Sequence, residues 1–581
     1  MPKLNSRTTQ TSGHARLITT TTTRPNTRTG NGAPAYTRDA KGELFLLATT
    51  TFHGENNAYE SGDDRSRRLV ELVREIAVTD FVWLSQFARW LRAEGNIRTV
   101  SIVIAAEAVK ARLDAGHHDY ACSNPSKCYE CKGWTENVTS RMTVRHNWIH
   151  YTNRKLVDSV LQRADEPGEL IAYWLSTYGK PIPISIKRGI SDAIKRLWTE
   201  YSFLKYDSDK ASVRFGDVVD LVQPAYHHKE FRGTWQYDLM GYALAKRHNR
   251  DEIAIGPNLP MIRARVNLMG KPVAERRRIL LNEGTEALKA AGMTWESVAG
   301  WLQGPMDAAA WEAIIPSMGY MSLIRNLRNF DEARISRQVA RQIAEKLGDP
   351  EQVARSRQLP YRFLSAHLHT DSLQWASALD AAMDASVRNI PSLPGRTLVM
   401  VDTSGSMDVP MSAKSKINRV QAGAMFGVAL AAKGEQVDLY GWADRAFHHP
   451  IKKGASVLRE TARFCKRVGE AGHGTLLSAS LNQAYKGHDR IVVVSDMQTT
   501  DILTRGDYAG YSFFRQTAQP FNLPAHVNLY GFNLAGHKAT PLDGKRGMYE
   551  MGGLTDQTFA NIARIEASQR EQWPWEMNEA A

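Results

Sequence analysis

The pattern of apolar residues changes once along the chain, across residues 391–395, Pro-Ser-Leu-Pro-Gly. Before this segment apolar residues recur at the three- and four-residue spacing of amphipathic helices, as in Leu69, Leu72, Val73 and Ile76. After it, short β-rich apolar runs alternate with helical stretches. The change predicts an α-helical part followed by an α/β part, with the boundary at the Pro- and Gly-containing segment.

The helical part begins with short helices between residues 69 and 112, interrupted at Thr79-Asp80 and at Gly95-Asn96. Such short helices bury their apolar stripes only by packing on neighbours. The pattern continues near residues 155–163, 169–178, 185–200, 236–247, 273–291, 310–328, 333–346 and 373–387. No fixed period relates these segments, so we expect an irregular solenoid or ring of HEAT-like helix pairs.

The C-terminal part contains four apolar runs that are typical of buried strands. They are residues 397–401, 436–442, 490–495 and 526–532, with helical stretches near 415–432, 457–467 and 477–486. This βα alternation predicts a parallel sheet covered on both faces. Ligands of such sheets bind at the carboxyl ends of the strands, so the residues after Val401 and Ser495 are the first candidates for a site.

Oxygen-bearing side chains follow these strands. Asp402, Ser404 and Ser406 form an Asp-x-Ser-x-Ser loop after the first strand, Asp496 follows the third, and Thr475 lies in a glycine-flanked loop between them. Carboxylates and hydroxyls are hard ligands that suit Mg²⁺ or Mn²⁺ better than zinc. A single Asp-x-Ser-x-Ser is also typical of a solvated turn that caps a helix, but the strand context favours a metal site.

This set resembles the metal-ion-dependent adhesion site of a von Willebrand factor A domain. The resemblance implies that Ser404, Ser406 and Thr475 supply hydroxyl ligands, while Asp402 and Asp496 act directly or through water. It also implies an open coordination position that captures an acidic group of a partner. No nucleophile is evidently paired with a base, and His473 beside Thr475 is read as an exposed loop residue, so we expect binding and no enzymatic activity.

Composition indicates the kind of partner. The chain has 581 residues with 74 Lys and Arg against 61 Asp and Glu, a net charge of +13, which favours a polyanion such as nucleic acid. Solubility alone is the alternative explanation of this charge. Residues 1–30 contain basic side chains and little to bury, so we expect a disordered basic arm. The absence of apolar stretches long enough to span a membrane leads us to expect a cytoplasmic protein without membrane partners.

Two segments of the helical part resemble the TROVE domain of the Ro autoantigen family. They are residues 32–47, which contain Gly-Ala-Pro-Ala-Tyr-Thr-Arg-Asp and Glu-Leu-Phe-Leu-Leu, and residues 318–327, Met-Gly-Tyr-Met-Ser-Leu-Ile-Arg-Asn-Leu. The order of a helical part and a von Willebrand A (Rossmann-like) domain is that of the family. The resemblance implies residues 31–390 as a helical ring that binds RNA, 391–570 as the metal-binding domain and 571–581 as a tail.

The family resemblance also implies the partners. Small structured noncoding RNA of the Y type would bind the outer surface, and the single-stranded ends of misfolded noncoding RNA would enter the central hole. The chain would then act as a scaffold of ribonucleoprotein assembly or in RNA quality control, monomeric apart from RNA. An exoribonuclease is a candidate protein partner, which the sequence does not identify.

One predicted helix combines an apolar stripe with a basic face. Lys187, Arg188, Lys195 and Arg196 lie opposite that stripe, where they can contact phosphates, and this region resembles the family's Y RNA-contacting helix. The alternative is an ordinary solvated face, whose charge Asp192 reduces. The run at residues 276–278 and the pair Arg325 and Arg328 are further candidates, although helix packing also accounts for the pair.

Three of the four cysteines lie close together, at Cys122, Cys128 and Cys131, with His117 and His118 upstream. Cys-x2-Cys spacing with a fourth ligand can hold structural Zn²⁺. The usual second pair of ligands is missing, which favours free thiols. Cys465 falls in a helical pattern and is expected in the core.

Two other functions remain open. A metal-dependent protein-interaction module without a specific RNA ligand would use its charge only for solubility, and salt-sensitive RNA co-purification separates the two. A nuclease is the other alternative, but a two-metal mechanism would need a second cluster of carboxylates, which the sequence does not show.

Overall fold

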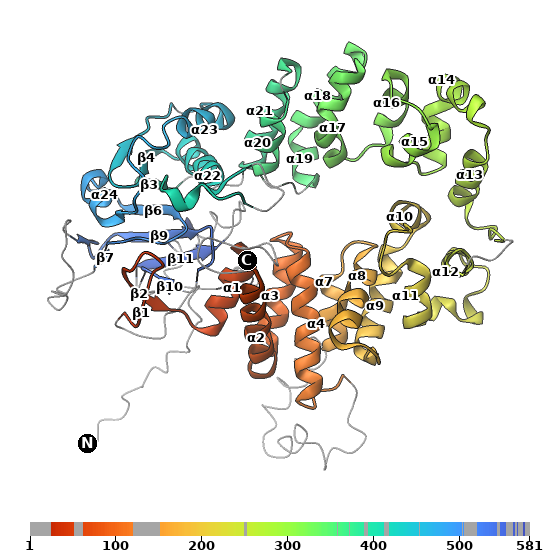
Figure 1. Cartoon of the computed structure of the whole chain (residues 1–581), viewed down its shortest axis with the longest axis horizontal. Helices are drawn as coiled ribbons and strands as arrows, with labels where there is room; N and C mark the ends of the chain where they lie inside the picture. Colours follow the sequence, from red (N-terminus) through yellow and green to blue (C-terminus); the bar gives the residue numbers. More distant parts are fainter. Residues whose placement is uncertain are drawn as a thin grey trace, which may run out of the picture. The chain divides into compact units, whose positions relative to one another are not determined.

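A computed structural model of the chain describes residues 25–50, 62–119, 152–248, 253–356, 358, 360–370, 372–388, 393–411, 417–452, 454–501, 503–504, 520–537, 539–542, 547–552 and positions 562, 563, 566, 573 and 575. The chain divides into two compact units. The helical unit comprises residues 52–56 and 61–388, and the sheet unit comprises residues 1–51, 57–60 and 389–581. Figure 1 shows both, coloured along the sequence.

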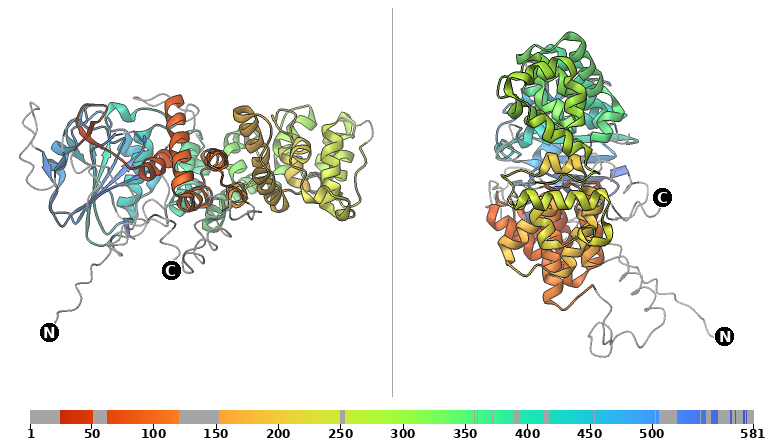
Figure 2. Two further views of the ribbon diagram at one scale, coloured as in Figure 1. Left: turned by 90° about the horizontal axis from the view of Figure 1, so that it is seen from below. Right: turned by 90° about the vertical axis from the view of Figure 1, so that its right-hand side faces the viewer.

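The helical unit is a succession of short helices, which Figure 2 shows from two further sides. They are α2 (Gly62–Thr79), α3 (Phe81–Ala93), α4 (Thr99–Asp114), α7 (Asn153–Val160), α8 (Glu166–Tyr178), α9 (Ile184–Leu197), α10 (Glu200–Tyr206), α11 (Phe215–Val222), α12 (Trp235–Arg247), α13 (Pro260–Met269), α14 (Val273–Ala290), α15 (Trp295–Leu302), α16 (Ala308–Ile314), α17 (Tyr320–Ala333), α18 (Arg337–Gly348), α19 (Pro350–Ser356), α20 (Pro360–Leu368) and α21 (Leu373–Ser386). Helices close in sequence pack together, as in α2 with α4, α7 with α9 and α14 with α16. The predicted helical-repeat character is confirmed.

Local signals fix where these helices end. Asp80 caps α3, because its carboxylate accepts a hydrogen bond from the backbone N–H of Trp83 at 3.1 Å. Asn96 adopts a φ of +51° in the turn before α4. The single helix predicted at residues 310–328 is instead two helices, α16 and α17, joined by a 3-10 turn over Ile315–Ser317. Pro316 in that turn cannot donate a helical hydrogen bond, which explains the break.

The sheet unit is built on a mixed sheet in the order β11-β9-β6-β3-β4-β5. Its strands are β3 (Arg396–Asp402), β4 (Gln436–Trp442), β5 (Ala446–His448), β6 (Arg490–Ser495), β9 (Asn528–Asn533) and β11 (Met548–Gly552). The pairs between β11, β9, β6, β3 and β4 are parallel, and the edge strand β5 is antiparallel to β4. The parallel sheet is confirmed, while β5 and β11 were not predicted.

Alternate residues of β3 face opposite helical layers. The helices that the structure describes in this unit are α1 (Ala40–Thr50), α22 (Arg419–Lys433), α23 (Val457–Cys465) and α24 (Leu477–Ala484). Leu398 and Met400 join the apolar cluster that contains Leu477 of α24. Val401 faces α22, where a Cβ added to Gly427 would lie 2.5 Å from its Cγ2. The sheet is therefore covered on both faces, as expected, and glycine lets α22 approach closely.

The N-terminal segment belongs to the sheet unit, which differs from the predicted boundary at residue 31. The short strands are β1 (Thr27–Arg28), β2 (Pro34–Thr37), β7 (Leu503–Thr504), β8 (Phe521–Asn522) and β10 (Ala539–Thr540). β2 pairs antiparallel with β1 and with β10. The buried Arg38 guanidinium donates to both carboxylate oxygens of Glu550 in β11, at 2.8 and 2.9 Å. Long-range pairs of this kind leave no mark on local sequence patterns.

Both chain ends depart from the expected arm and tail where they are described. Residues 25–30 form the start of the β1–β2 hairpin, while residues 1–24 lie outside the described residues. In the predicted tail, Trp573 and Trp575 are buried and stack on each other, with ring centroids 5.4 Å apart. Phe45 of α1 packs 5.4 Å from the Trp573 ring. Aromatic burial thus anchors part of this segment to α1.

Candidate functional site

The predicted oxygen donors gather at the carboxyl edge of the sheet. Asp402 ends β3 and Asp496 follows β6, and these two strands are parallel neighbours. Ser404 and Ser406 follow Asp402, and Thr475 lies in the loop before α24. That loop is tied to the other two, because the Gly405 N–H donates to His473 O at 3.2 Å and the Thr500 N–H donates to Thr475 O at 2.9 Å.

Asp402 is fully buried and its two oxygens are used within the protein. Oδ1 accepts the Ser404 N–H at 2.8 Å, and Oδ2 accepts the Ser495 hydroxyl at 2.5 Å. The Ser404 and Ser406 hydroxyl oxygens lie 3.2 Å apart, and Ser406 is only half-buried. Burial, and then the charge of Asp496, raise the pKa of Asp402.

Asp496 is also fully buried but only partly satisfied. Its Oδ1 accepts the Gln498 N–H at 3.2 Å, whereas its Oδ2 has no hydrogen-bond partner among the residues that the structure describes. His537 Nε2 lies 4.0 Å from that oxygen, beyond hydrogen-bond range. Burial raises the pKa of Asp496, and the neighbouring Ser406 hydroxyl opposes part of that rise. Two buried carboxylates, one with an unsatisfied oxygen, are what a divalent cation would stabilise.

The donor set fits a hard divalent ion. Asp402 and Asp496 offer carboxylate oxygen, and Ser404, Ser406 and Thr475 offer hydroxyl oxygen. Among the described residues no group of three or more His, Cys, Asp and Glu side chains gathers around a point, so ligation here would depend on the hydroxyls. Mg²⁺ or Mn²⁺ therefore fits these side chains better than a metal that prefers sulfur or imidazole.

The N-terminal hairpin contributes a wall of this site that sequence reasoning missed. In the turn between β1 and β2, Asn31 Nδ2 donates to Thr475 Oγ1 at 3.0 Å and to Gln498 O at 2.7 Å. Thr29 Oγ1 donates to Thr499 O at 2.8 Å, and the Gly30 N–H donates to Gln498 Oε1. Asn31 thus touches a candidate ligand from more than 400 positions away in sequence, and no local pattern marks it.

The predicted basic face lies on α9, opposite the buried Ile186, Ile190, Ala193 and Ile194. Two of its four cations already have acidic neighbours. Arg196 donates to Asp158 Oδ1 at 2.9 Å and to Leu161 O at 2.6 Å, and Lys195 Nζ lies 3.7 Å from Asp192 Oδ1.

Asp192 of α9 has a second basic neighbour besides Lys195. Arg154 of α7 also binds Asp192 through two hydrogen bonds, at 2.5 and 2.8 Å. Lys187 is half-buried and Arg188 exposed, and neither forms an ion pair with a residue that the structure describes. RNA binding by these four residues stays a prediction, and Lys187 and Arg188 are the two that remain available.

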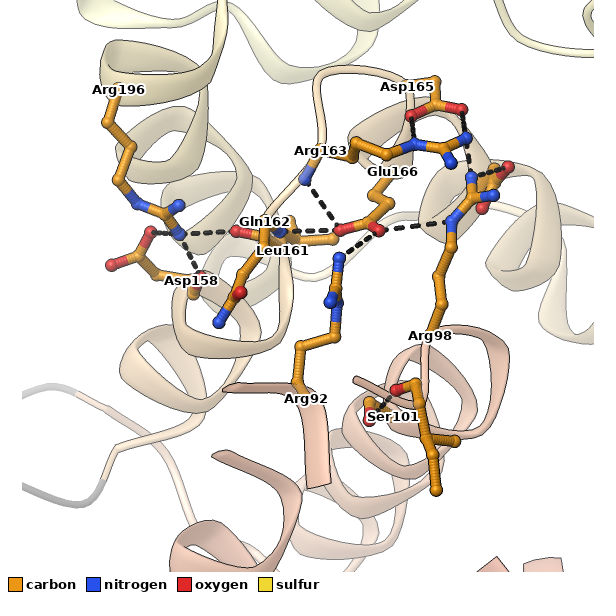
Figure 3. A network of polar contacts seen from close by, with 12 residues as sticks. Arg92, Arg98, Ser101, Asp158, Leu161, Gln162, Arg163, Asp165, Glu166 and Arg196 are labelled. Carbon is orange, nitrogen blue, oxygen red and sulfur yellow. Dashed lines mark hydrogen bonds and ion pairs between the residues drawn. The ribbon is translucent and has the colours of Figure 1, made fainter. Parts of the chain in front are cut away.

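A buried network lies beside this face (Figure 3). Glu166 is fully buried and accepts from Arg92 at 2.7 Å, with Arg98 Nε 3.1 Å away and the N–H groups of Gln162 and Arg163 at 2.6 and 2.9 Å. A buried carboxylate needs such partners. These arginines therefore stabilise the fold rather than present charge to a ligand.

The other basic candidates differ in whether their guanidinium groups already have partners in the protein. Arg276 donates to Lys271 O and Trp301 O, and Arg277 binds Asp307 at 2.7 Å, so two of the three arginines at 276–278 are engaged. Arg325 and Arg328 of α17 are exposed. Helix packing, the alternative explanation for this pair, does not use their guanidinium groups.

The cysteine cluster is not tested, because Cys122, Cys128 and Cys131 lie outside the described residues. Cys465 is half-buried at the end of α23, and burial raises the pKa of its thiol to about 12. Among the described helices none has the length and apolar character required to cross a membrane.

Comparison with known proteins bears on the helical unit. The family model of the TROVE domain matches residues 291–377, a stretch that includes the segment 318–327 and helix α17. This match confirms the resemblance to the TROVE domain over that segment of the chain. A comparison with curated proteins finds no match.

A solved structure has a similar fold. The crystal structure of the Deinococcus radiodurans Ro (RSR) protein is similar with a TM-score of 0.55 and 13% identity, covering 91% of this chain and 100% of that one. The fold class, helical repeats followed by an α/β domain of the von Willebrand A type, is confirmed. The TROVE match at residues 291–377 and this fold together support an RNA-binding protein of the Ro type.

Proposed function

We propose that this TROVE-domain protein binds small structured noncoding RNA of the Y-like kind and the unpaired ends of misfolded noncoding RNA. It would act in the cytoplasm as a scaffold of ribonucleoprotein assembly or in RNA quality control. The observation that carries the proposal is the TROVE match at residues 291–377 within a helical-repeat unit. A net charge of +13 supports it, because neutralising phosphates is the main source of affinity for RNA.

The sheet unit would supply a metal-dependent protein contact. Asp402, Ser404, Ser406, Thr475 and Asp496 would hold Mg²⁺ or Mn²⁺, and the ion would offer a coordination position to an acidic group of a partner. The unsatisfied Oδ2 of buried Asp496 supports this role. We propose binding without catalysis, because the oxygen donors provide no nucleophile paired with a base.

The RNA proposal is tested with the full chain in filter-binding assays. The probes are a structured hairpin RNA, the same hairpin with an unpaired 3′ extension, and double-stranded DNA of matched length. We expect both RNAs to bind more tightly than the DNA. Equal binding of all three would reduce the chain to a general polyanion binder, and no binding of either RNA would refute the proposal.

Asp402→Ala separates the two roles. The variant should lose divalent-ion binding in a calorimetric titration and should keep its RNA affinity. Incubation of RNA with Mg²⁺ should leave the RNA intact in wild type and variant alike. Metal-dependent degradation that Asp402→Ala abolishes would instead establish the nuclease alternative.

A metal-dependent protein-interaction module without a specific RNA ligand is the second candidate, and the same Asp496 oxygen favours it. The two candidate functions predict different molecules that co-purify with the chain: RNA for the first and protein partners for the second. Partners that require Mg²⁺ and survive ribonuclease treatment, in a preparation free of bound RNA, would favour the second.

A further inference from the structure

The helical unit contains a groove between α17 and α20 with a volume of about 570 Å³. Its wall includes Arg325 and Arg328 of α17, Arg362 of α20 and His369. Met321 and Ile324 add apolar surface between these cations. The volume falls within the range of about 300–1,000 Å³ typical of sites that enclose a small ligand or part of a larger one.

The described residues of the groove wall carry positive charge. They include three arginines and, among the lining residues that the structure describes, no Asp or Glu. Arg325 forms no ion pair with any described residue, and Arg328 lies 3.3 Å from Glu332 in a contact where both side chains are more than 60% exposed. Such an exposed pair contributes little and exchanges readily for another anion.

In other basic clusters of the helical unit, arginines form ion pairs with acids of neighbouring elements. Arg196 binds Asp158, Arg154 binds Asp192 and Arg277 binds Asp307. An arginine that is already neutralised releases no counterion when a phosphate approaches. Arg325 and Arg328 therefore hold more of the charge that is available to a polyanion.

The polar part of the wall is held in place by internal hydrogen bonds. His369 Nδ1 lies 2.6 Å from Ser365 O, a geometry in which Nδ1 carries the proton and donates it to the carbonyl. Asn329 Nδ2 donates to Asn326 Oδ1 at 2.7 Å, and buried Asn326 donates to Ser322 O at 2.8 Å. A wall fixed in this way loses little conformational entropy when a ligand binds.

Resting on the proposed RNA-binding function, we propose that this groove binds an unpaired stretch of RNA. The arginines would contact successive phosphates, and bases would lie on the apolar surface of Met321 and Ile324 or stack on guanidinium planes. Unpaired bases can be splayed apart in this way, whereas the bases of a duplex are stacked inside it. The groove therefore favours single-stranded over double-stranded RNA.

The test compares two variants of the full chain with equal loss of charge. One is Arg325→Gln, Arg328→Gln and Arg362→Gln in the groove. The other is Arg337→Gln, Arg341→Gln and Arg355→Gln, three exposed arginines of α18 and α19 that do not line it. Gln preserves helix propensity, and circular dichroism confirms folding.

Binding of a short unpaired RNA is measured over a range of salt concentrations, with its duplex and a mononucleotide as competitors. Three lost phosphate contacts should flatten the salt slope by about 2, at roughly 0.7 per contact, which corresponds to a loss on the order of a hundredfold at 0.1 M salt. The control triple variant should keep nearly the wild-type slope. Neither competitor should displace the unpaired RNA at equal nucleotide concentration.

The outcomes separate this inference from the function on which it rests. Absence of RNA binding by the wild type would refute the proposed function. Wild-type binding with equal losses in the two triple variants would leave RNA binding intact and refute the groove. Displacement by the mononucleotide or the duplex would also refute it, because the site would then select a single nucleotide or paired RNA.

Discussion

The face of α9 and the groove between α17 and α20 are both rich in basic residues, but their charges are used differently. At the α9 face, Arg196 contacts Asp158 of α7, and Asp192 contacts both Lys195 and Arg154 of α7. In the groove, the lining residues that the structure describes include no acid. The difference teaches that the count of Lys and Arg on a helix is a poor guide to a polyanion site. What matters is whether acids on neighbouring elements have already neutralised them.

The same distinction applies to the carboxylates. Glu166 in the helical unit is buried with Arg92, Arg98 and two backbone N–H groups around it, whereas Asp496 in the sheet unit is buried with one oxygen unsatisfied. The first arrangement stabilises the fold, but it leaves Glu166 and its arginines unavailable to a ligand. The second lowers stability and leaves a group ready for a ligand.

The largest loss of stability should come from removing the charge of Glu166, the buried carboxylate that is fully paired. Glu166→Gln would leave two buried or half-buried arginines without their anion, and we expect the free energy of unfolding to fall by about 3–5 kcal/mol. Urea denaturation followed by circular dichroism measures it. Arg325→Gln, which removes an unpaired groove cation, should change stability by less than about 0.5 kcal/mol. Similar losses in both variants would mean that pairing does not distinguish the two regions.

Removing the charge of Asp496, whose Oδ2 is unsatisfied, should have the opposite effect on stability. Asp496→Asn removes a buried charge without a full set of partners, so the metal-free variant should be more stable than the wild type. It should also lose the stabilisation by Mg²⁺, which at a hundredfold excess over Kd amounts to about 2.7 kcal/mol in a protein that binds the ion.

Thermal denaturation with and without Mg²⁺ measures both effects. Asp438→Asn is the matched control, because Asp438 is paired at 2.8 Å with both Arg396 and His488. That variant should keep its response to Mg²⁺ and gain no stability. A metal response that survives in Asp496→Asn would place the ion elsewhere.

A smaller effect is expected at the N-terminal hairpin. Asn31 orients the Thr475 hydroxyl by donating to its oxygen, so Asn31→Ala should weaken Mg²⁺ binding about tenfold, or about 1.4 kcal/mol, the lower range for residues that orient metal ligands. Calorimetric titration gives the affinity. Asn26→Ala removes a side chain whose hydrogen bonds to described residues go to Thr37 in the same hairpin region, and this variant should bind Mg²⁺ as the wild type does. Equal affinities of the two variants would mean that Asn31 has no influence on the ligand.

The contrast also shows what a sequence can predict. Asp402 and Asp496 were predicted to lie at one edge because they follow strands that a βα pattern makes parallel, and topology then brings them together. Asn31 was missed because its contact depends on where the β1–β2 hairpin docks, which only tertiary structure decides. The pairing of Arg196 with Asp158 was missed for the same reason, since helical periodicity shows the outward face of α9 but not which acids of α7 lie beside it.

The smallest effect is predicted for a substitution that leaves cations of the α9 face without their acid. Asp192→Asn on α9 removes the acid that neutralises Arg154 and lies near Lys195. These side chains are roughly one quarter to one half exposed, so the lost ion pairs should lower the free energy of unfolding by about 1 kcal/mol or less, and by still less at high salt, where exposed charges are screened. The released cations should strengthen RNA binding several-fold and steepen its salt slope by about one unit. Filter binding at several salt concentrations, with Glu332→Gln beside the groove as a control of equal charge change, measures this. Weaker RNA binding by Asp192→Asn would contradict the comparison, because Asp192 would then be orienting Arg154 and Lys195 toward RNA instead of neutralising them.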